Sequence, residues 1–117
     1  MSDSVSISFV RHVKDYAWES GAEDEESVSI YSHHGGKILV KLAQDFIETL
    51  DGPSSADPIT RREPDALVAP FINMLDEDFT MHFRIDAKPM VVADNGHWQI
   101  DVYTGKAKKI MEAEKHE

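Results

Sequence analysis

The sequence predicts an α+β domain, a two-layer sandwich of two helices on an antiparallel sheet. Apolar residues alternate near both ends of the chain, whereas the middle repeats with the period of a helix. The resulting order is β-β-α-α-β-β-β. Because the helices are grouped rather than interleaved with strands, this order favours an α+β sandwich over a doubly wound nucleotide fold. With 117 residues, we expect one domain over residues 1–117.

The N-terminal third predicts two strands separated by an acidic loop. Apolar side chains at Val5, Ile7 and Phe9 alternate with serines, which is typical of a strand with one buried face. A second strand is expected at 28–31. Between them, the segment 19–27 is so dense in like charges that it predicts a solvated loop.

The strongest pattern predicts a helix that begins at Lys37, because its apolar residues fall on one helical face. Gly52 and Pro53 supply the stop, since glycine accepts the cap geometry and proline cannot extend the helix. The segment 52–63 then reads as a connecting loop. The apolar residues of this helix are Ile38, Leu39, Leu42, Ala43, Phe46, Ile47 and Leu50.

A second helix is predicted over 64–75. Pro64 suits its first turn, and Asp65 interacts favourably with the positive end of the helix dipole. Pro70 removes one backbone hydrogen bond, which predicts that the helix is short, kinked or restarted there.

The C-terminal third predicts strands joined by tight turns. Residues 79–86 alternate in polarity, which indicates a half-buried strand with its apolar side facing inward. Asn95 and Gly96 favour positive φ and predict a hairpin that joins 90–93 to 97–103. A last strand is expected at 106–110, followed by a frayed tail at 111–117. Trp98, Ile100 and Val102 share one face of the second hairpin arm.

Charge predicts the kind of partner. The chain has 22 acidic residues against 12 Lys and Arg, a formal net charge of −10, which repels nucleic acids and anionic membranes and attracts basic surfaces. We therefore expect a protein partner with a basic surface and no direct contact with nucleic acid or membrane. Solubility alone is the alternative explanation, and the oligomeric state stays open. The expected binding residues are Glu19, Glu23, Asp24, Glu25, Glu26, Asp76, Glu77 and Asp78.

Cysteine is absent, which excludes disulfides, thiolate nucleophiles and cysteine zinc sites. No apolar run reaches the roughly 20 residues of a membrane helix, and residues 1–4 do not resemble a leader peptide. We expect a soluble protein in the cytoplasm of a host cell.

The segment 32–36, Ser-His-His-Gly-Gly, is either a ligand site or a corner between strand and helix. Adjacent histidines project to opposite faces of an extended chain, so His33 and His34 make a poor metal chelate. Gly35 and Gly36 precede a helix with Lys37 beside them, yet the spacing is not that of a P-loop. The corner is the favoured reading, and a ligand site formed by His33, Gly35, Gly36 and Lys37 is the alternative. We expect no metal and no cofactor.

Nucleophilic catalysis is not indicated by any motif. The G-x-S-x-G elbow is absent, and Ser32 next to His33 has the composition of a catalytic pair without its direction. We therefore predict no catalytic residues and do not expect an enzyme.

A resemblance links several of these features. A strand ending in Tyr31, His33, Gly35 and Gly36 is followed by two apolar helices and a C-terminal hairpin. This arrangement resembles a group of small uncharacterised phage and prophage proteins with a Tyr-x-His-x-Gly-Gly pattern, over roughly residues 28–110. The position after the histidine is often aromatic in that group and is His34 here. The resemblance implies a phage or mobile-element origin and carries no activity with it.

The function expected from charge and resemblance together is stoichiometric interference. Small acidic phage proteins of this type resemble anti-restriction and anti-CRISPR inhibitors, in which carboxylates occupy the place of nucleic-acid phosphates. One alternative is a small-molecule or phosphate-binding domain, or an enzyme, centred on 33–37. Another is a virion or structural component.

Overall fold

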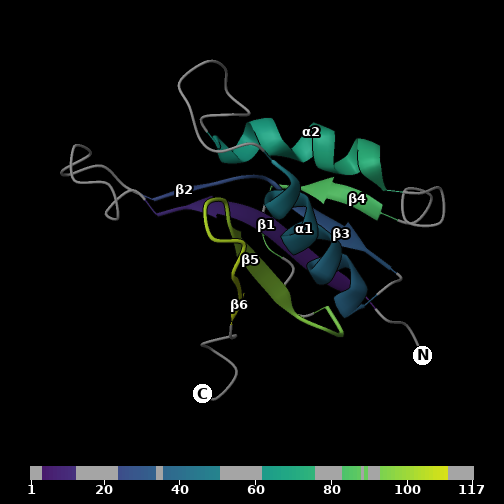
Figure 1. The fold of residues 1–117 in the computed structure, drawn as a ribbon. Helices are drawn as coiled ribbons and strands as arrows, with labels where there is room; N and C mark the ends of the chain where they lie inside the picture. The colour runs from purple at the N-terminus through teal and green to yellow at the C-terminus, as the bar shows by residue number, and fades with distance from the viewer. Residues whose placement is uncertain are drawn as a thin grey trace.

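The computed structural model describes residues 4–12, 24–33, 36–50, 62–75, 83–87, 89 and 93–110. A six-stranded, mostly antiparallel sheet carries two helices, which confirms the α+β class and is compatible with a two-layer sandwich (Figure 1). The elements are β1 Val5–Arg11, β2 Glu25–Glu26, β3 Ser29–Ser32, α1 Lys37–Thr49, α2 Pro64–Met74, β4 Phe83–Asp86, β5 His97–Asp101 and β6 Ala107–Ile110.

The first strand, β1, lies at the centre of the sheet. The strand order is β4-β3-β1-β5-β6, and β2 also pairs with β1. On one side β1 pairs antiparallel with β2 and β3, whereas on the other side it pairs parallel with β5. The sheet is therefore mostly antiparallel, as predicted, with one parallel pairing among the described strands. The reason is that both helices and β4 intervene between β1 and β5, and this long connection allows a parallel pairing.

The core lies between β1 and the two helices. The predicted alternation is confirmed, because Val5, Ile7 and Phe9 are fully buried in the hydrophobic cluster. The ring of Phe9 meets Phe71 of α2 at 5.6 Å and Phe46 of α1 at 6.0 Å between centroids. Since Phe46 and Phe71 also touch, at 5.5 Å, one aromatic triangle fixes both helices over β1.

Both helices form where the sequence predicts them. Gly36 precedes α1 with φ 50, a conformation that favours glycine, so it serves as the predicted corner. The second helix, α2, is short and continues through Pro70 without interruption. Before α2, buried Arg62 adopts φ 61 and donates from Nη1 to the Val102 carbonyl at 2.6 Å. This contact ties the start of α2 to the end of β5.

The predicted hairpin around Asn95 and Gly96 is wrong in its pairing. Gly96 does adopt positive φ, at 78, but β5 lies between β1 and β6 and pairs with both of them. The turn instead docks on the start of β1, where the Asn95 N–H donates to the Ser4 carbonyl at 2.9 Å and Ser6 N–H donates to the Gly96 carbonyl at 3.0 Å. Residues 90–92 lie outside the described part.

The predicted loop over 19–27 is wrong at Glu25 and Glu26, which form β2. Their backbones pair with Arg11 and Val10, and Arg11 offsets one of the two charges through an ion pair with Glu25. Backbone pairing with β1 thus outweighs the repulsion that the sequence suggested. Residues 19–23 lie outside the described part.

Of the strand predicted at 79–86, residues Phe83–Asp86 form β4, and Ile85 on its predicted apolar side is only half covered. Ile85 is 50% exposed. The described helices contact mainly β1, β2 and β5. Residues 52–61, 79–82 and 111–117 lie outside the described part, and the loop and tail expected there stay predictions.

Candidate functional site

A β-bulge separates β2 from β3. Ile7 pairs with Ile30, and Val10 pairs with Glu26. Three residue steps along β1 therefore face four steps along the other chain, which is the signature of a bulge. In the unshifted register Glu26 would oppose Arg11, whereas the extra residue places Glu26 opposite Val10. This shift moves the Glu26 side chain to the face of the sheet opposite α1 and α2, which is called the far face below.

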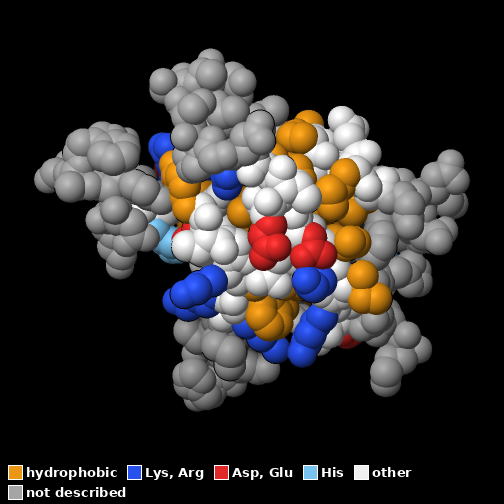
Figure 2. All heavy atoms as spheres, in the orientation of Figure 1, with side chains coloured by type: hydrophobic (Ala, Val, Ile, Leu, Met, Phe, Trp, Pro, Cys, Tyr) orange, Lys and Arg blue, Asp and Glu red, His pale blue; other side chains and the backbone are white. Residues whose placement is uncertain are grey.

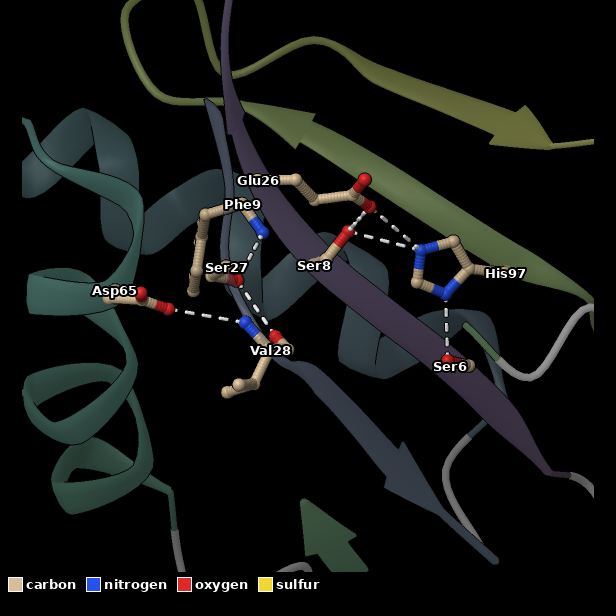
Figure 3. A network of polar contacts seen from close by, with 8 residues as sticks. All are labelled: Ser6, Ser8, Phe9, Glu26, Ser27, Val28, Asp65 and His97. Carbon is tan, nitrogen blue, oxygen red and sulfur yellow. Dashed lines mark hydrogen bonds and ion pairs between the residues drawn. The ribbon is translucent and has the colours of Figure 1, made fainter. Parts of the chain in front are cut away.

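Polar contacts hold this bulge in place (Figure 3). The Ser27 N–H donates to the Phe9 carbonyl at 2.9 Å, and the Phe9 N–H donates to Ser27 Oγ at 3.0 Å. The Val28 N–H donates to Asp65 Oδ1 at 3.2 Å. Since Asp65 lies in the first turn of α2, the bulge is tied to the helix as well as to β1.

Four polar side chains from β1, β2 and β5 meet on the far face (Figure 3). The imidazole of His97 is fully buried. Its Nδ1 lies 2.7 Å from Ser6 Oγ, and its Nε2 lies 3.0 Å from Ser8 Oγ and 3.5 Å from Glu26 Oε2. Ser8 Oγ also donates to Glu26 Oε2 at 2.5 Å. Ser6, Ser8, His97 and Glu26 are called the serine–histidine network below.

The hydrogen bonds within the network assign its protons. Ser8 gives its only hydroxyl hydrogen to Glu26, so its oxygen accepts from His97 and Nε2 carries a hydrogen. The pKa of Glu26 is lowered from 4.5 to about 2, chiefly by the hydrogen bond from His97 and further by those from Ser8 and Gln99, against the opposing effect of partial burial. Glu26 is therefore a carboxylate throughout the neutral range.

Serine, histidine and a carboxylate are also the components of a hydrolytic triad. Here, however, the hydroxyls of Ser6 and Ser8 belong to fully buried residues of the central strand. A substrate carbonyl has no path to either oxygen in this conformation, so the arrangement satisfies buried polar groups rather than presenting a nucleophile.

The predicted acidic binding residues are only partly described. Asp24 forms an ion pair with His12 at 2.9 Å, and Glu25 forms one with Arg11 at 2.5 Å. With Glu26 held by the network, all three described acids have partners within the chain. Glu19, Glu23, Asp76, Glu77 and Asp78 lie outside the described residues.

The same region nevertheless forms an acidic groove between β2 and the start of α2. Its volume is about 480 Å³. Four acidic residues and one arginine line it, and because the Glu26 carboxylate lies in the network on the far face, Glu25, Glu63 and Asp65 supply the negative charge that favours a cationic occupant. The acidic groove is lined by Arg11, Glu25, Glu26, Glu63, Pro64 and Asp65.

Negative charge is distributed unevenly between the described and the remaining residues. The described part holds ten acidic side chains against eight Lys and Arg, and the remaining residues hold the other twelve acids against four bases. On the face drawn in Figure 2, the largest acidic area lies over α1, beside basic side chains. The acidic groove is thus a local concentration on a fold whose described charges nearly balance.

The corner at 32–36 does not bring its described members together. His33 is exposed and contacts Tyr31, with the two ring centroids 4.9 Å apart. Lys37 lies instead over the ring of Trp98, with Nζ 6.0 Å from its centroid. His34 and Gly35 lie outside the described residues, so the ligand site suggested for this segment stays a prediction.

A second hollow of about 430 Å³ lies beside the turn between β5 and β6. Asp101 accepts hydrogen bonds from the backbone N–H groups of Tyr103 and Thr104, both at 2.8 Å. Its carboxylate therefore holds the turn. Because the lining mixes charges of both signs, the hollow favours neither an anion nor a cation. The lining residues are His12, Gln99, Asp101, Thr104, Lys106, Ala107 and Lys108.

Among the described residues, no three His, Cys, Asp or Glu side chains are grouped to hold a metal ion. Neither of the described helices has the length and hydrophobicity needed to cross a bilayer.

Sequence reasoning missed the serine–histidine network. The alternation of serine with apolar residues over 4–9 does show that β1 has a serine face. It does not show that His97 lies against that face, because that contact depends on the parallel register of β1 and β5. Comparisons with family models, curated proteins and solved structures found no match.

Proposed function

We propose that this protein binds a partner protein with a basic surface and thereby blocks that partner. The observation that carries the proposal is the acidic groove, whose lining brings together Glu25 of β2, Asp65 of α2 and Glu63 just before α2, with Arg11 as its single basic residue. A lysine or arginine side chain of a partner placed there exchanges water for carboxylate oxygens of opposite charge.

The groove is built on rigid elements. Glu25 and Glu26 are paired through their backbones to β1, and Asp65 holds the bulge next to them. The ion pair of Glu25 with Arg11 and the hydrogen bond from Val28 to Asp65 also hold these two carboxylates before a partner arrives, which lowers the cost of ordering them on binding. The larger negative charge of the residues outside the described part adds long-range attraction to the same kind of partner.

The biological setting that we propose is counter-defence in a phage or prophage, of the anti-restriction or anti-CRISPR type. A nuclease or another nucleic-acid-handling protein carries the basic surface that fits such a groove. Occupying that surface with carboxylates excludes the nucleic acid, so inhibition is stoichiometric and needs no catalytic residue.

The experiment compares two variants of equal net charge. Glu63→Lys reverses a charge in the groove, whereas Glu48→Lys reverses an exposed charge on α1 away from it. Binding of a fluorescein-labelled hexa-arginine peptide is followed by anisotropy, after circular dichroism has confirmed that both variants fold. We expect Glu63→Lys to weaken binding about tenfold more than Glu48→Lys, a difference of about 1.4 kcal/mol.

If both variants weaken the affinity for the peptide equally, the peptide responds only to the net charge of the protein, and the acidic groove is not its binding site. The salt dependence gives a second check. Affinity for the peptide must fall as ionic strength rises, because screening weakens contacts between exposed charges. Binding that persists unchanged at 1 M salt would contradict charge recognition.

A further inference from the structure

The two ends of the described sheet differ in how they are protected. At one end, β6 exposes Lys108 and Lys109, and lysines on an edge strand oppose pairing with another chain. At the other end, β4 carries Ile85, which is 50% exposed. Among the described strands, β4 has only β3 as a neighbour. Its second edge is therefore a candidate surface for strand addition.

The apolar surface at this end is larger than one side chain. Met74, the last residue of α2, is 44% exposed. Figure 2 shows hydrophobic side chains gathered on the side of the molecule where β4 and the end of α2 lie. Exposed apolar area next to an open strand edge is typical of an interaction surface.

The sequence of β4 is complementary to itself. Arg84 and Asp86 flank Ile85 and form an ion pair at 3.0 Å. Both lie on the far face, because Arg84 pairs with Tyr31 and Asp86 with Ser29 in the register of β3. The guanidinium of Arg84 lies 4.8 Å from the centre of the Tyr31 ring, and its side chain is still 54% exposed.

We propose that β4 pairs antiparallel with β4 of a second copy of this chain, about a two-fold axis through Ile85. This axis places Ile85 opposite Ile85 of the second copy, and Arg84 opposite Asp86 of the second copy. Residues directly opposite in an antiparallel pair have Cβ atoms about 4.5–5.5 Å apart, so both charge pairs are within reach. The interface is isologous and closes as a dimer.

This dimer continues the sheet across the two-fold axis into one sheet of both copies. On the helix side, the two Ile85 side chains cover each other. On the far face, four charges alternate in sign across the two central strands. A contact built on a four-residue strand is small, so the dimer dissociates on dilution.

The test is a charge exchange followed by sedimentation velocity on the full chain. Arg84→Asp places two pairs of like charges across the axis, and Asp86→Arg does the same with the opposite sign. Replacing two favourable cross-strand pairs by two unfavourable ones raises the dimer dissociation constant by about tenfold to a hundredfold. Each single variant is therefore monomeric at concentrations where the wild type forms dimers.

Mixing the two single variants provides the decisive measurement. In the mixed dimer, every aspartate of one chain faces an arginine of the other, so we expect a heterodimer to form where neither variant dimerises alone. The double variant Arg84→Asp with Asp86→Arg restores the homodimer as well. Lys108→Asp, on the opposite edge of the sheet, is the control and leaves the dissociation constant unchanged.

A wild-type chain that sediments as a monomer up to millimolar concentration overturns the proposal. Single variants that dimerise as the wild type does, or a mixture that stays monomeric, overturn it as well. Ile85→Lys keeps both native charges and removes the apolar contact, so its loss of dimers supports the proposed axis even where a charge variant folds poorly. These outcomes are independent of the acidic groove.

Discussion

Replacing His97 with alanine tests whether the serine–histidine network holds the sheet together. The imidazole is fully buried and bonds to Ser6 at 2.7 Å and Ser8 at 3.0 Å. Two lost hydrogen bonds cost about 1 kcal/mol each. The space left by a buried ring adds about 2–3 kcal/mol, at the lower end of large-to-alanine substitutions. We therefore expect His97→Ala to lower the free energy of unfolding by about 4–5 kcal/mol, a large share of the ~5–15 kcal/mol of a typical domain.

The measurement is urea unfolding at pH 7, followed by far-ultraviolet circular dichroism, together with a thermal melt. For a chain of 117 residues, a loss of this size lowers Tm by about 15–20 °C. His12→Ala is the matched control, because its ring is one-third exposed and has one ion pair, with Asp24. That variant should lose less than about 1 kcal/mol. If His97→Ala loses no more than His12→Ala, the network does not stabilise the fold.

The pKa of Glu26 is 4.5 in the unfolded chain and about 2 in the folded one, so the stability that its carboxylate contributes is complete above pH 4.5 and is lost as pH falls toward 2. Glu26→Gln should flatten this part of the pH profile of urea unfolding. An unchanged slope would argue against the lowered pKa. Asp65→Ala removes the bond from Val28 and should cost about 1 kcal/mol in thermal melts, more than Asp45→Ala on the exposed face of α1. Phe71→Ala opens the aromatic triangle and should cost about 3–5 kcal/mol by urea unfolding, whereas a loss below 1.5 kcal/mol would contradict the packing described.

Local periodicity was sufficient to predict the helices and most of the core, but it was wrong at Ile38, which is 61% exposed although the pattern placed it on the apolar face of α1. The apolar face of residues 37–50 became α1, and Val5, Ile7 and Phe9 became the core face of β1. These predictions succeed because burial of one face depends only on neighbouring residues along the chain. Trp98 and Ile100 of β5, and Val102 just after it, pack on the core for the same reason.

Strand pairing was beyond the reach of such patterns. The Asn95-Gly96 turn forms, but it is hydrogen-bonded to the Ser4 backbone at the start of β1, and β5 pairs with β1 and β6. The pairing of Glu25 and Glu26 with β1 depends on Arg11 and on the bulge at Ser27. Each of these outcomes is decided by groups distant in sequence, so neither the network around His97 nor the acidic groove could be placed from spacing alone.

The central position of β1 has a consequence for biosynthesis. Ser6 and His97, which bond to each other across β1 and β5, are 91 residues apart in the sequence. A ribosome adding about 5–20 residues per second makes β1 about 5–18 s before β5. Throughout that interval the middle strand of the sheet lacks its parallel neighbour, and its apolar side chains are available for wrong associations. Folding of the sheet is therefore completed only after β5 has been made, and until then molecular chaperones have the most to protect in the nascent segment that carries β1.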